Sequence, residues 1–515
     1  MHVDILRRLL RLTAVVVFAA WPVPASGQQP QPLLDANGEV IEEAYDYLSR
    51  PLSAEDRRYE SIRGARLKEL MNEVVAFSRL SRDAGDRQWG RMAGGPYEAM
   101  TADWSQAIFE ALGMENIRRQ YFDLPPQWTP VDWEFTATGG DRQLTFGSLL
   151  PASGSTPVPE GTRLEAVWVG NGSEADFLGR DVRGKAVVLQ TILAPGQMGH
   201  SANWEGATVR AEENGAAMIV GIWGYAGNMA VWQGLGGTRT TRTNPDGTTT
   251  TIRNPVELPG FFMGWDDGKR LRDLIGTGAR VVIDASLDVE MRENLSSPSV
   301  FGTLPGTTDE RIYVMSHMDG YFDAALDNAS GMAVMMALAE HFARVPQSAR
   351  RRGITFIATA GHHVGSPSAG FMRDNPETLE RVALMLNCEH IAPTQFVQFG
   401  NEIRRTTTVS PRRWWVHGSE QVLDIVLDAY RTFGVSLVGR MDPRATGEMG
   451  QIEDLAPSVQ LIRSPEHKHT DLDVPELVSG AGMEAVARAF AKIVDGVNTL
   501  SLEETLPASL VTDQQ

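Results

Sequence analysis

The chain has 515 residues, of which 42% are hydrophobic and 22% are charged, a globular composition that excludes disordered, collagen-like and disulfide-scaffold proteins. Its single cysteine, Cys388, excludes an internal disulfide and a thiolate-rich metal site, so bound metal would need histidines and carboxylates. The net charge of −18 disfavours binding to nucleic acid, and the length predicts about two to four domains.

Residues 1–27 have the pattern of a secretory signal peptide. Arg7, Arg8 and Arg11 precede an apolar stretch, and Ala25-Ser26-Gly27 resembles a cleavage site. The apolar stretch is shorter than the roughly 20 residues that span a bilayer, although an uncleaved anchor is the alternative. We therefore expect an exported, periplasmic or extracellular protein without an integral membrane segment.

The next two regions differ in their apolar pattern. Residues 28–133 have helical spacing and end in the proline-rich stretch 124–133, whereas residues 134–290 contain short β-rich runs separated by Gly, Asn and Asp. Within the second region, the threonine-rich segment 238–253 surrounds an Asn-Pro-Asp-Gly turn. Either an exposed β-hairpin or a disordered segment fits its composition.

Residues 291–500 alternate strand-like and helical runs, and residues 501–515 form a tail. The alternation predicts an α/β fold with a mostly parallel mixed sheet flanked by helices.

Histidines concentrate in this region, because all but His2 and His200 follow residue 300. Four apolar runs end in side chains that can bind metal: His317 with Asp319, His362-His363, Glu389-His390, and His467 with His469. In open α/β sheets, ligands bind at the carboxyl ends of the strands. Asp327-Asn328 precedes an apolar helix, where a carboxylate faces the helix N-terminus.

Each of these features also has an ordinary structural explanation. A single His at a strand end is usually a hydrogen-bonded structural residue, and an Asp-Asn pair is usually a helix cap. We interpret Cys388 as a small buried hydrophobic residue. The series taken together favours a metal site.

The order and spacing of this series resemble the co-catalytic two-zinc aminopeptidases, relatives of glutamate carboxypeptidase and glutaminyl cyclase. The likeness rests on "SHMDG" around His317, on "DNASG" from Asp327 to Gly331, on Glu389 after an apolar strand, and on the His-Thr-x-x-Asp pattern from His469 to Asp473. It covers most of residues 297–497 and extends to the helices of 56–122. Residues 134–290 resemble a protease-associated domain inserted before the first ligand, which we interpret as a lid or as a wall of the substrate cleft.

The resemblance implies two Zn²⁺ ions, or other divalent metals, and a role for each residue. His317, Asp327 and Glu389 would hold one metal, while His469, His363 and the bridging Asp327 would hold the other. Asp319 would orient His317 through its second ring nitrogen, and His362 would be the proton acceptor.

One departure from the family concerns the general base. The family has Glu-Glu where this chain has His362-His363. A neutral imidazole at position 363 can still bind zinc, and two nearby dications would favour the neutral form of His362, which leaves it a free but weak base. In addition, "TGEMG" (446–450) stands where the family has a Ser-Asp-His-like segment.

The leading hypothesis is an exported metal-dependent aminopeptidase that cleaves peptides or aminoacyl compounds with water activated by the metals. The alternative is an inactive homologue that acts as a binding protein, because the Glu-Glu pair is missing. Cyclisation of the glutaminyl-cyclase kind is a third option. A thermolysin-type His-Glu-x-x-His helix, a nucleophile elbow, a phosphate loop and a dinucleotide fingerprint are all absent from the sequence.

Overall fold

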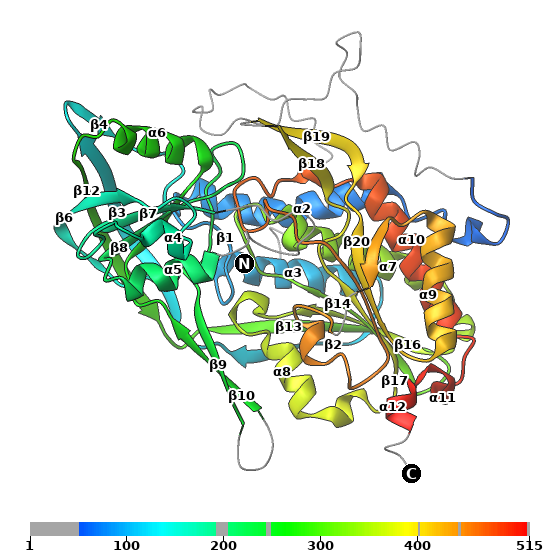
Figure 1. Ribbon diagram of the computed structural model, residues 1–515. Helices are drawn as coiled ribbons and strands as arrows, with labels where there is room; N and C mark the ends of the chain where they lie inside the picture. Colours follow the sequence, from blue (N-terminus) through cyan, green and yellow to red (C-terminus); the bar gives the residue numbers. More distant parts are fainter. Residues whose placement is uncertain (1–50, 192–203, 244–248, 400–401, 441–443, 512–515) are drawn as a thin grey trace, which may run out of the picture.

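The computed structural model describes residues 51–191, 204–243, 249–399, 402–440 and 444–511. The predicted signal peptide lies outside these residues. The described chain forms two lobes, each built on a mixed eight-stranded sheet (Figure 1). In the described part of the chain, no helix is long and apolar enough to cross a membrane.

The larger lobe has the predicted α/β fold with helices on both sides of its sheet. The strand order is β2 (Glu115–Asp123), β13 (Ser296–Leu304), β16 (Gly353–Thr359), β14 (Arg311–His317), β17 (Val382–Cys388), β22 (Ser458–Ile462), β20 (Arg412–His417) and β21 (Leu437–Arg440). The central strands β16, β14, β17 and β22 are parallel, so their carboxyl ends meet at one edge.

Alternate side chains of these strands serve two hydrophobic cores. Ile312 and Val314 of β14 pack in the core that contains α2 (Gly64–Asp83), α7 (Gly331–Ala343) and α10 (Gly480–Val497). Met315 packs on the other side with α8 (Pro367–Asp374). The remaining helices of this lobe are α3 (Pro96–Ala111), α9 (Glu420–Phe433), α11 (Leu502–Thr505) and α12 (Ala508–Val511).

The helical pattern predicted for residues 28–133 was wrong at its end. Residues 115–123 form strand β2, which pairs antiparallel with β13. β3 begins at Gln127, within the stretch expected to close the helical region. Strand β2 lies at the edge of the sheet, and its residues are either exposed or half-buried. Because neither face of the strand is deeply buried, its period-two pattern is weak.

The smaller lobe contains strands β3 (Gln127–Gly139), β4 (Arg142–Leu144), β5 (Leu150–Pro151), β6 (Val158–Trp168), β7 (Ala186–Gln190), β8 (Met218–Ile222), β11 (Gly260–Met263) and β12 (Val281–Arg292). Helix α6 (Trp265–Gly276) packs on one face of this sheet, and α4 (Glu174–Phe177) and α5 (Trp204–Glu213) pack on the other. Because β3 and β12 pair along their length, the chain leaves and re-enters the larger lobe through adjacent strands.

Three two-stranded ribbons complete the part of the fold that the structure describes. β1 (Gly90–Arg91) pairs with β15 (Gly320–Tyr321), and β18 (Thr394–Phe399) pairs with β19 (Glu402–Val409). The hairpin interpretation of the threonine-rich segment is confirmed for its described strands, because β9 (Gly237–Thr243) and β10 (Thr249–Pro255) pair antiparallel.

The start of α7 is packed directly against the end of β17. A Cβ atom on Gly331 would lie 2.1 Å from the backbone oxygen of Cys388 and 2.4 Å from the side-chain oxygen of Asn328. Gly331→Ala should therefore destabilise the protein by about 1–3 kcal/mol, because rigid backbone has to move. Gly276→Ala, at the exposed end of α6 with nothing within 4 Å, is the matched control and should not destabilise. Thermal melting of both variants tests this, and equal melting temperatures would contradict it.

Candidate metal centre

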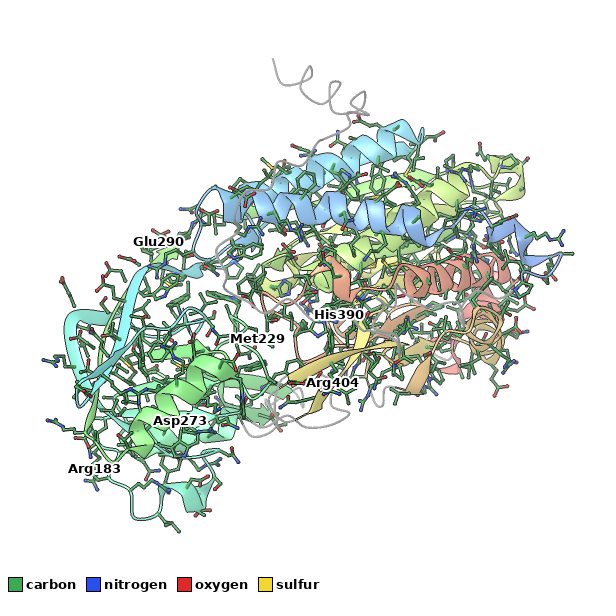
Figure 2. All side chains as sticks on the ribbon, turned by 90° about the horizontal axis from the view of Figure 1, so that it is seen from above. Arg183, Met229, Asp273, Glu290, His390 and Arg404 are labelled. Carbon is green, nitrogen blue, oxygen red and sulfur yellow. The ribbon has the colours of Figure 1, made fainter. Side chains whose placement is uncertain are left out.

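The predicted site residues converge at the carboxyl edge of the larger sheet. His317 ends β14, His362 and His363 follow β16, and Glu389 and His390 follow β17. His469 comes from the loop after β22, and Asp327 lies in the irregular turn Ala325–Ser330 before α7. The parallel strands and their loops thus bring these seven residues together, whereas His467, also singled out in the sequence, packs against Phe396. His390 lies on the side of the larger lobe that faces Met229 of the smaller lobe (Figure 2).

Asp327 is the centre of the cluster, with only 1% of its side chain exposed. Its Oδ1 lies 3.1 Å from His317 Nε2 and 3.0 Å from His390 Nε2. Its Oδ2 lies 3.3 Å from His363 Nε2 and 3.0 Å from His469 Nε2. Each carboxylate oxygen therefore faces the ring nitrogens of two histidines.

The first group contains three buried atoms without a hydrogen-bond partner. These atoms are His317 Nε2, Asp327 Oδ1 and His390 Nε2. Leaving buried polar atoms unsatisfied is costly, and the distances of the two ring nitrogens from Asp327 Oδ1, 3.1 and 3.0 Å, approach the roughly 3.3 Å expected between two ligands bonded to one tetrahedral zinc ion. A cation placed among the three atoms would satisfy all of them.

The second group is equally compact. His363 Nε2 and His469 Nε2 lie 3.1 Å apart, and both lie close to Asp327 Oδ2. Two imidazoles and one carboxylate oxygen are a donor set that suits zinc. The residues present therefore fit two divalent cations that share the Asp327 carboxylate.

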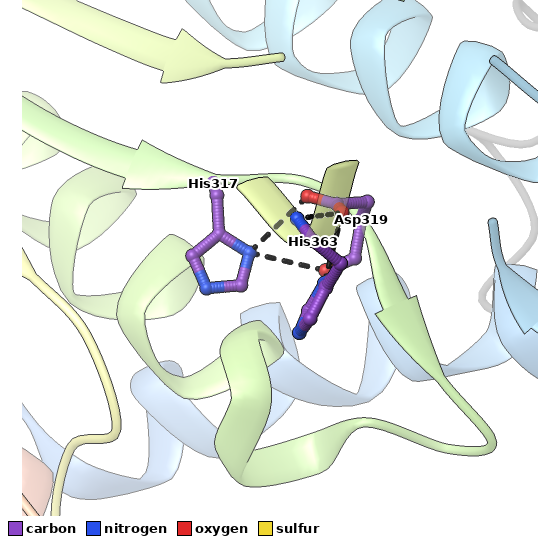
Figure 3. Close-up of side chains that lie close together, drawn as sticks. All are labelled: His317, Asp319 and His363. Atoms are coloured by element: carbon purple, nitrogen blue, oxygen red, sulfur yellow. Dashed lines mark hydrogen bonds and ion pairs between the residues drawn. The ribbon is translucent and has the colours of Figure 1, made fainter. Parts of the chain in front are cut away.

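Asp319 orients two of these histidines (Figure 3). Its Oδ2 accepts a hydrogen bond of 2.8 Å from His363 Nδ1, and its Oδ1 lies 3.4 Å from His317 Nδ1. It also accepts the backbone N–H groups of His362 and His363. Burial opposes its ionisation, but the neighbouring His363 and His317 hold the pKa of Asp319 well below its usual value. With Nδ1 facing Asp319, each ring directs Nε2 toward the cluster.

The "DNASG" segment holds two parts of the site together. Asn328 accepts the backbone N–H of His390 and donates to the backbone oxygen of Cys388, at 3.2 and 2.9 Å. Ser330 accepts the N–H of Ile391 at 3.0 Å. The loop that carries Asp327 is thereby fixed to the end of β17.

Asp473, the last residue of the His-Thr-x-x-Asp pattern, holds the other side of this loop. It accepts the backbone N–H groups of Leu326 and Asp327, at 2.7 and 3.1 Å. Burial raises the pKa of Asp473 to about 7. The pattern thus contributes His469 to the cluster and a carboxylate that positions Asp327.

His362 lies beside the cluster rather than within it. Its ring stacks on His317 with centroids 3.9 Å apart and planes 10° apart. Its Nε2 is 3.7 Å from Glu389 Oε1, and its Nδ1 is 3.9 Å from Glu448 Oε1. Burial, together with the nearby His317 and His363, holds the pKa of His362 well below its usual value, which keeps the imidazole neutral.

The sequence analysis did not identify two charged residues that lie near the site. Glu448, from the "TGEMG" segment, is fully buried beside His362, and burial raises its pKa to about 7. Lys468 Nζ lies 3.3 Å from Asp327 Oδ2. The departure at 446–450 was a signal for Glu448, whereas a lysine beside a candidate ligand has no recognisable pattern. The ring nitrogen of His390 was also missed as a partner of Asp327, because Glu389 was the residue that matched the family.

The smaller lobe contacts the loop that carries His469. The backbone N–H of Trp232 donates to the backbone oxygen of His469 at 2.8 Å, and Val231 forms a β-bridge with Thr470. The ring of Tyr321 lies between Trp232 and the site, with its centroid 4.6 Å from that of His363. Contacts of the smaller lobe therefore reach the backbone of a candidate metal ligand.

The larger lobe has an α/β fold, and histidines and carboxylates gather at the carboxyl edge of its mixed sheet. This arrangement is typical of a metallohydrolase. Residues 299–493 match the model of Peptidase family M28, so the resemblance to co-catalytic zinc aminopeptidases is confirmed for this part of the chain. The family is one of metal-dependent peptidases that act on peptides. No curated protein matches the chain.

Solved structures share the fold. A zinc aminopeptidase from Bacillus subtilis has a TM-score of 0.59 at 18% identity, covering 86% of this chain and 98% of its own. A peptidase M28 precursor from Shewanella amazonensis has a TM-score of 0.58 at 15% identity, covering 84% and 97%. An aminopeptidase from Aneurinibacillus sp. strain AM-1 has a TM-score of 0.53 at 17% identity, covering 88% and 97%.

Removing the carboxylate that orients His317 and His363 should weaken metal binding. We expect Asp319→Asn to lower zinc affinity about 10- to 100-fold, the usual effect of losing such a partner. Asp309→Asn is the control, because Asp309 is an exposed partner of Arg381 just before β14. Competition with a chromogenic chelator measures both affinities, and equal values would show that Asp319 does not support the metal site.

Proposed function

We propose that this chain is an exported aminopeptidase that uses two zinc ions. The observation that carries the proposal is the Asp327 carboxylate, each oxygen of which faces two imidazole nitrogens within 3.3 Å. One cation would be held by Asp327 Oδ2, His363 and His469. The other would be held by Asp327 Oδ1 and His317, together with a ligand from the end of β17, where Glu389 and His390 both lie.

The residues around the cluster have distinct roles in amide hydrolysis. Two bound cations would polarise the amide carbonyl and make water more acidic. Asp319 fixes the rings of His317 and His363, and Asp473 fixes the backbone of Asp327. His362, held neutral, accepts the proton of the attacking water and returns it to the leaving amine.

Two features support the finer parts of this proposal. Residues 1–27 have the pattern of a signal peptide, which supports export. The solved structures that share this fold include a zinc aminopeptidase and a further aminopeptidase, which supports the proposed activity.

The proposal predicts about two zinc ions per purified chain and hydrolysis of amino acid p-nitroanilides with a free amino group. His317→Ala should lose metal and nearly all activity. The matched control is His417→Ala, because His417 pairs with Ser458 at the opposite edge of the sheet. Elemental analysis and a substrate panel that includes N-acetylated compounds measure these outcomes. A wild-type protein that binds no metal would refute the proposal.

A second candidate is a binding protein that has kept the fold and lost turnover. His362 favours it, because an imidazole stands where the family has a glutamate and its nearest carboxylate oxygen, on Glu389, is 3.7 Å away. A neutral ring with a strongly lowered pKa is a weak base.

Substitutions at His362 distinguish the two candidates. If His362 moves the proton, His362→Ala should lower kcat by about 10²- to 10⁴-fold with metal content unchanged. If the natural chain is inactive, it should bind metal without turnover, and His362→Glu should create activity. Steady-state kinetics of the three proteins, each with its metal content measured, decide the question. Unchanged kcat in His362→Ala would exclude His362 as the proton acceptor.

A further inference from the structure

Two adjacent residues at the end of β17 could complete the first cation site. His390 Nε2 lies 3.0 Å from Asp327 Oδ1, is buried, and has no hydrogen-bond partner. Its distance from Asp327 Oδ1 is therefore nearly the same as that of His317 Nε2, which is 3.1 Å. Glu389 Oε1 is 3.8 Å from His390 Nε2, so its carboxylate also borders the site.

The surroundings of Glu389 engage one oxygen of its carboxylate in hydrogen bonds away from the cluster. Oε2 accepts hydrogen bonds from Asn387 Nδ2 at 2.8 Å and from Gln460 Nε2 at 3.2 Å. Gly447 covers the carboxylate so closely that a Cβ there would lie 2.9 Å from both oxygens. The remaining oxygen, Oε1, lies 3.7 Å from His362 Nε2 and 3.8 Å from His390 Nε2. One ligand atom from each of Glu389, His317 and His390 lies within 4.8 Å of the others, but Asp327 Oδ1 is nearer to His390 Nε2, at 3.0 Å.

The surroundings of His390 instead direct its ring nitrogen at Asp327. Its Nδ1 is hydrogen-bonded to Ser464 Oγ at 3.1 Å, which leaves Nε2 pointing into the cluster. Its backbone has a positive φ of 50°, so the chain turns sharply after the strand. Asn328 binds the backbone N–H of this residue and so couples its position to the Asp327 loop.

We propose that His390, and not Glu389, is the third protein ligand of the first cation. This inference rests on the proposed two-metal function. The centre then consists of two matching halves, each with two imidazoles and one oxygen of Asp327. A donor set of four imidazoles and one carboxylate selects zinc or cobalt over the oxygen-preferring manganese and magnesium. Glu389 stays outside the ligand set as a neighbour of His362.

Paired substitutions test the assignment by metal content. His390→Ala and His390→Asn should each bind one zinc ion fewer per chain than the natural protein, or bind it at least tenfold more weakly. Glu389→Gln should retain the natural content. Elemental analysis and chelator competition give the numbers. Loss of a metal ion from Glu389→Gln would overturn the proposal, as would full retention by both His390 variants. Absence of metal from the natural protein would instead refute the proposed function.

A gain-of-signal experiment covers the case in which those variants fail to fold. Cobalt bound to a cysteine thiolate gives a near-ultraviolet charge-transfer band that imidazole and carboxylate ligands lack. We expect H390C loaded with Co²⁺ to show this band, and E389C and the natural chain to lack it. The natural chain is a suitable blank because its only cysteine, Cys388, is buried and burial raises the pKa of that thiol. A band in E389C and none in H390C would assign the site to Glu389.

Discussion

The site depends on one carboxylate that is shared by four imidazoles. Asp327 is almost fully buried, and burial alone would oppose its ionisation, yet Lys468, His390 and His363 hold its pKa well below the usual value. A buried charge of this kind is stable only with close partners of opposite charge. The surrounding fold fixes those partners from four strand ends, so the parallel core of the sheet and the electrostatics of Asp327 are parts of one constraint.

Much of this arrangement could be predicted from the sequence, because the carboxyl ends of parallel strands meet at one edge of a sheet. Each apolar run ends at the same edge, so His317, His363, Glu389 and His469 had to lie near one another once the α/β pattern was recognised. The residues of the "DNASG" segment each have a separate structural role. Asp327 faces the imidazoles, and Asn328 and Ser330 bind the backbone after β17. Gly331 allows the close approach of Cys388.

Other parts could not be predicted because they depend on single torsions and long-range packing. Two neighbouring residues after a strand end, Glu389 and His390, both project past the edge, and the positive φ of His390 with the contact to Ser464 decides which ring nitrogen faces Asp327. Glu448 approaches His362 from a loop about 85 residues further along the chain. Strand β2 was missed because its half-exposed residues lack a strong apolar alternation.

The charge around the centre offers a physical reason for its unusual histidine content. Replacing a carboxylate ligand by His363, and again by His390, leaves one carboxylate among five candidate ligands. Negative charge lies one layer further out on Asp319, whose pKa is held well below its usual value, and the carboxyl groups of Glu389, Glu448 and Asp473 are buried in the same layer. Burial raises the pKa of Glu448 and of Asp473 to about 7, so these two are only partly ionised near neutral pH. Arg91, fully buried behind the ligand loop and hydrogen-bonded to the backbone oxygens of Met318, Asp323 and Ala324, opposes them. Cations in such a site would be attracted by charges they do not touch, so residues outside the ligand set would govern how tightly metal is held.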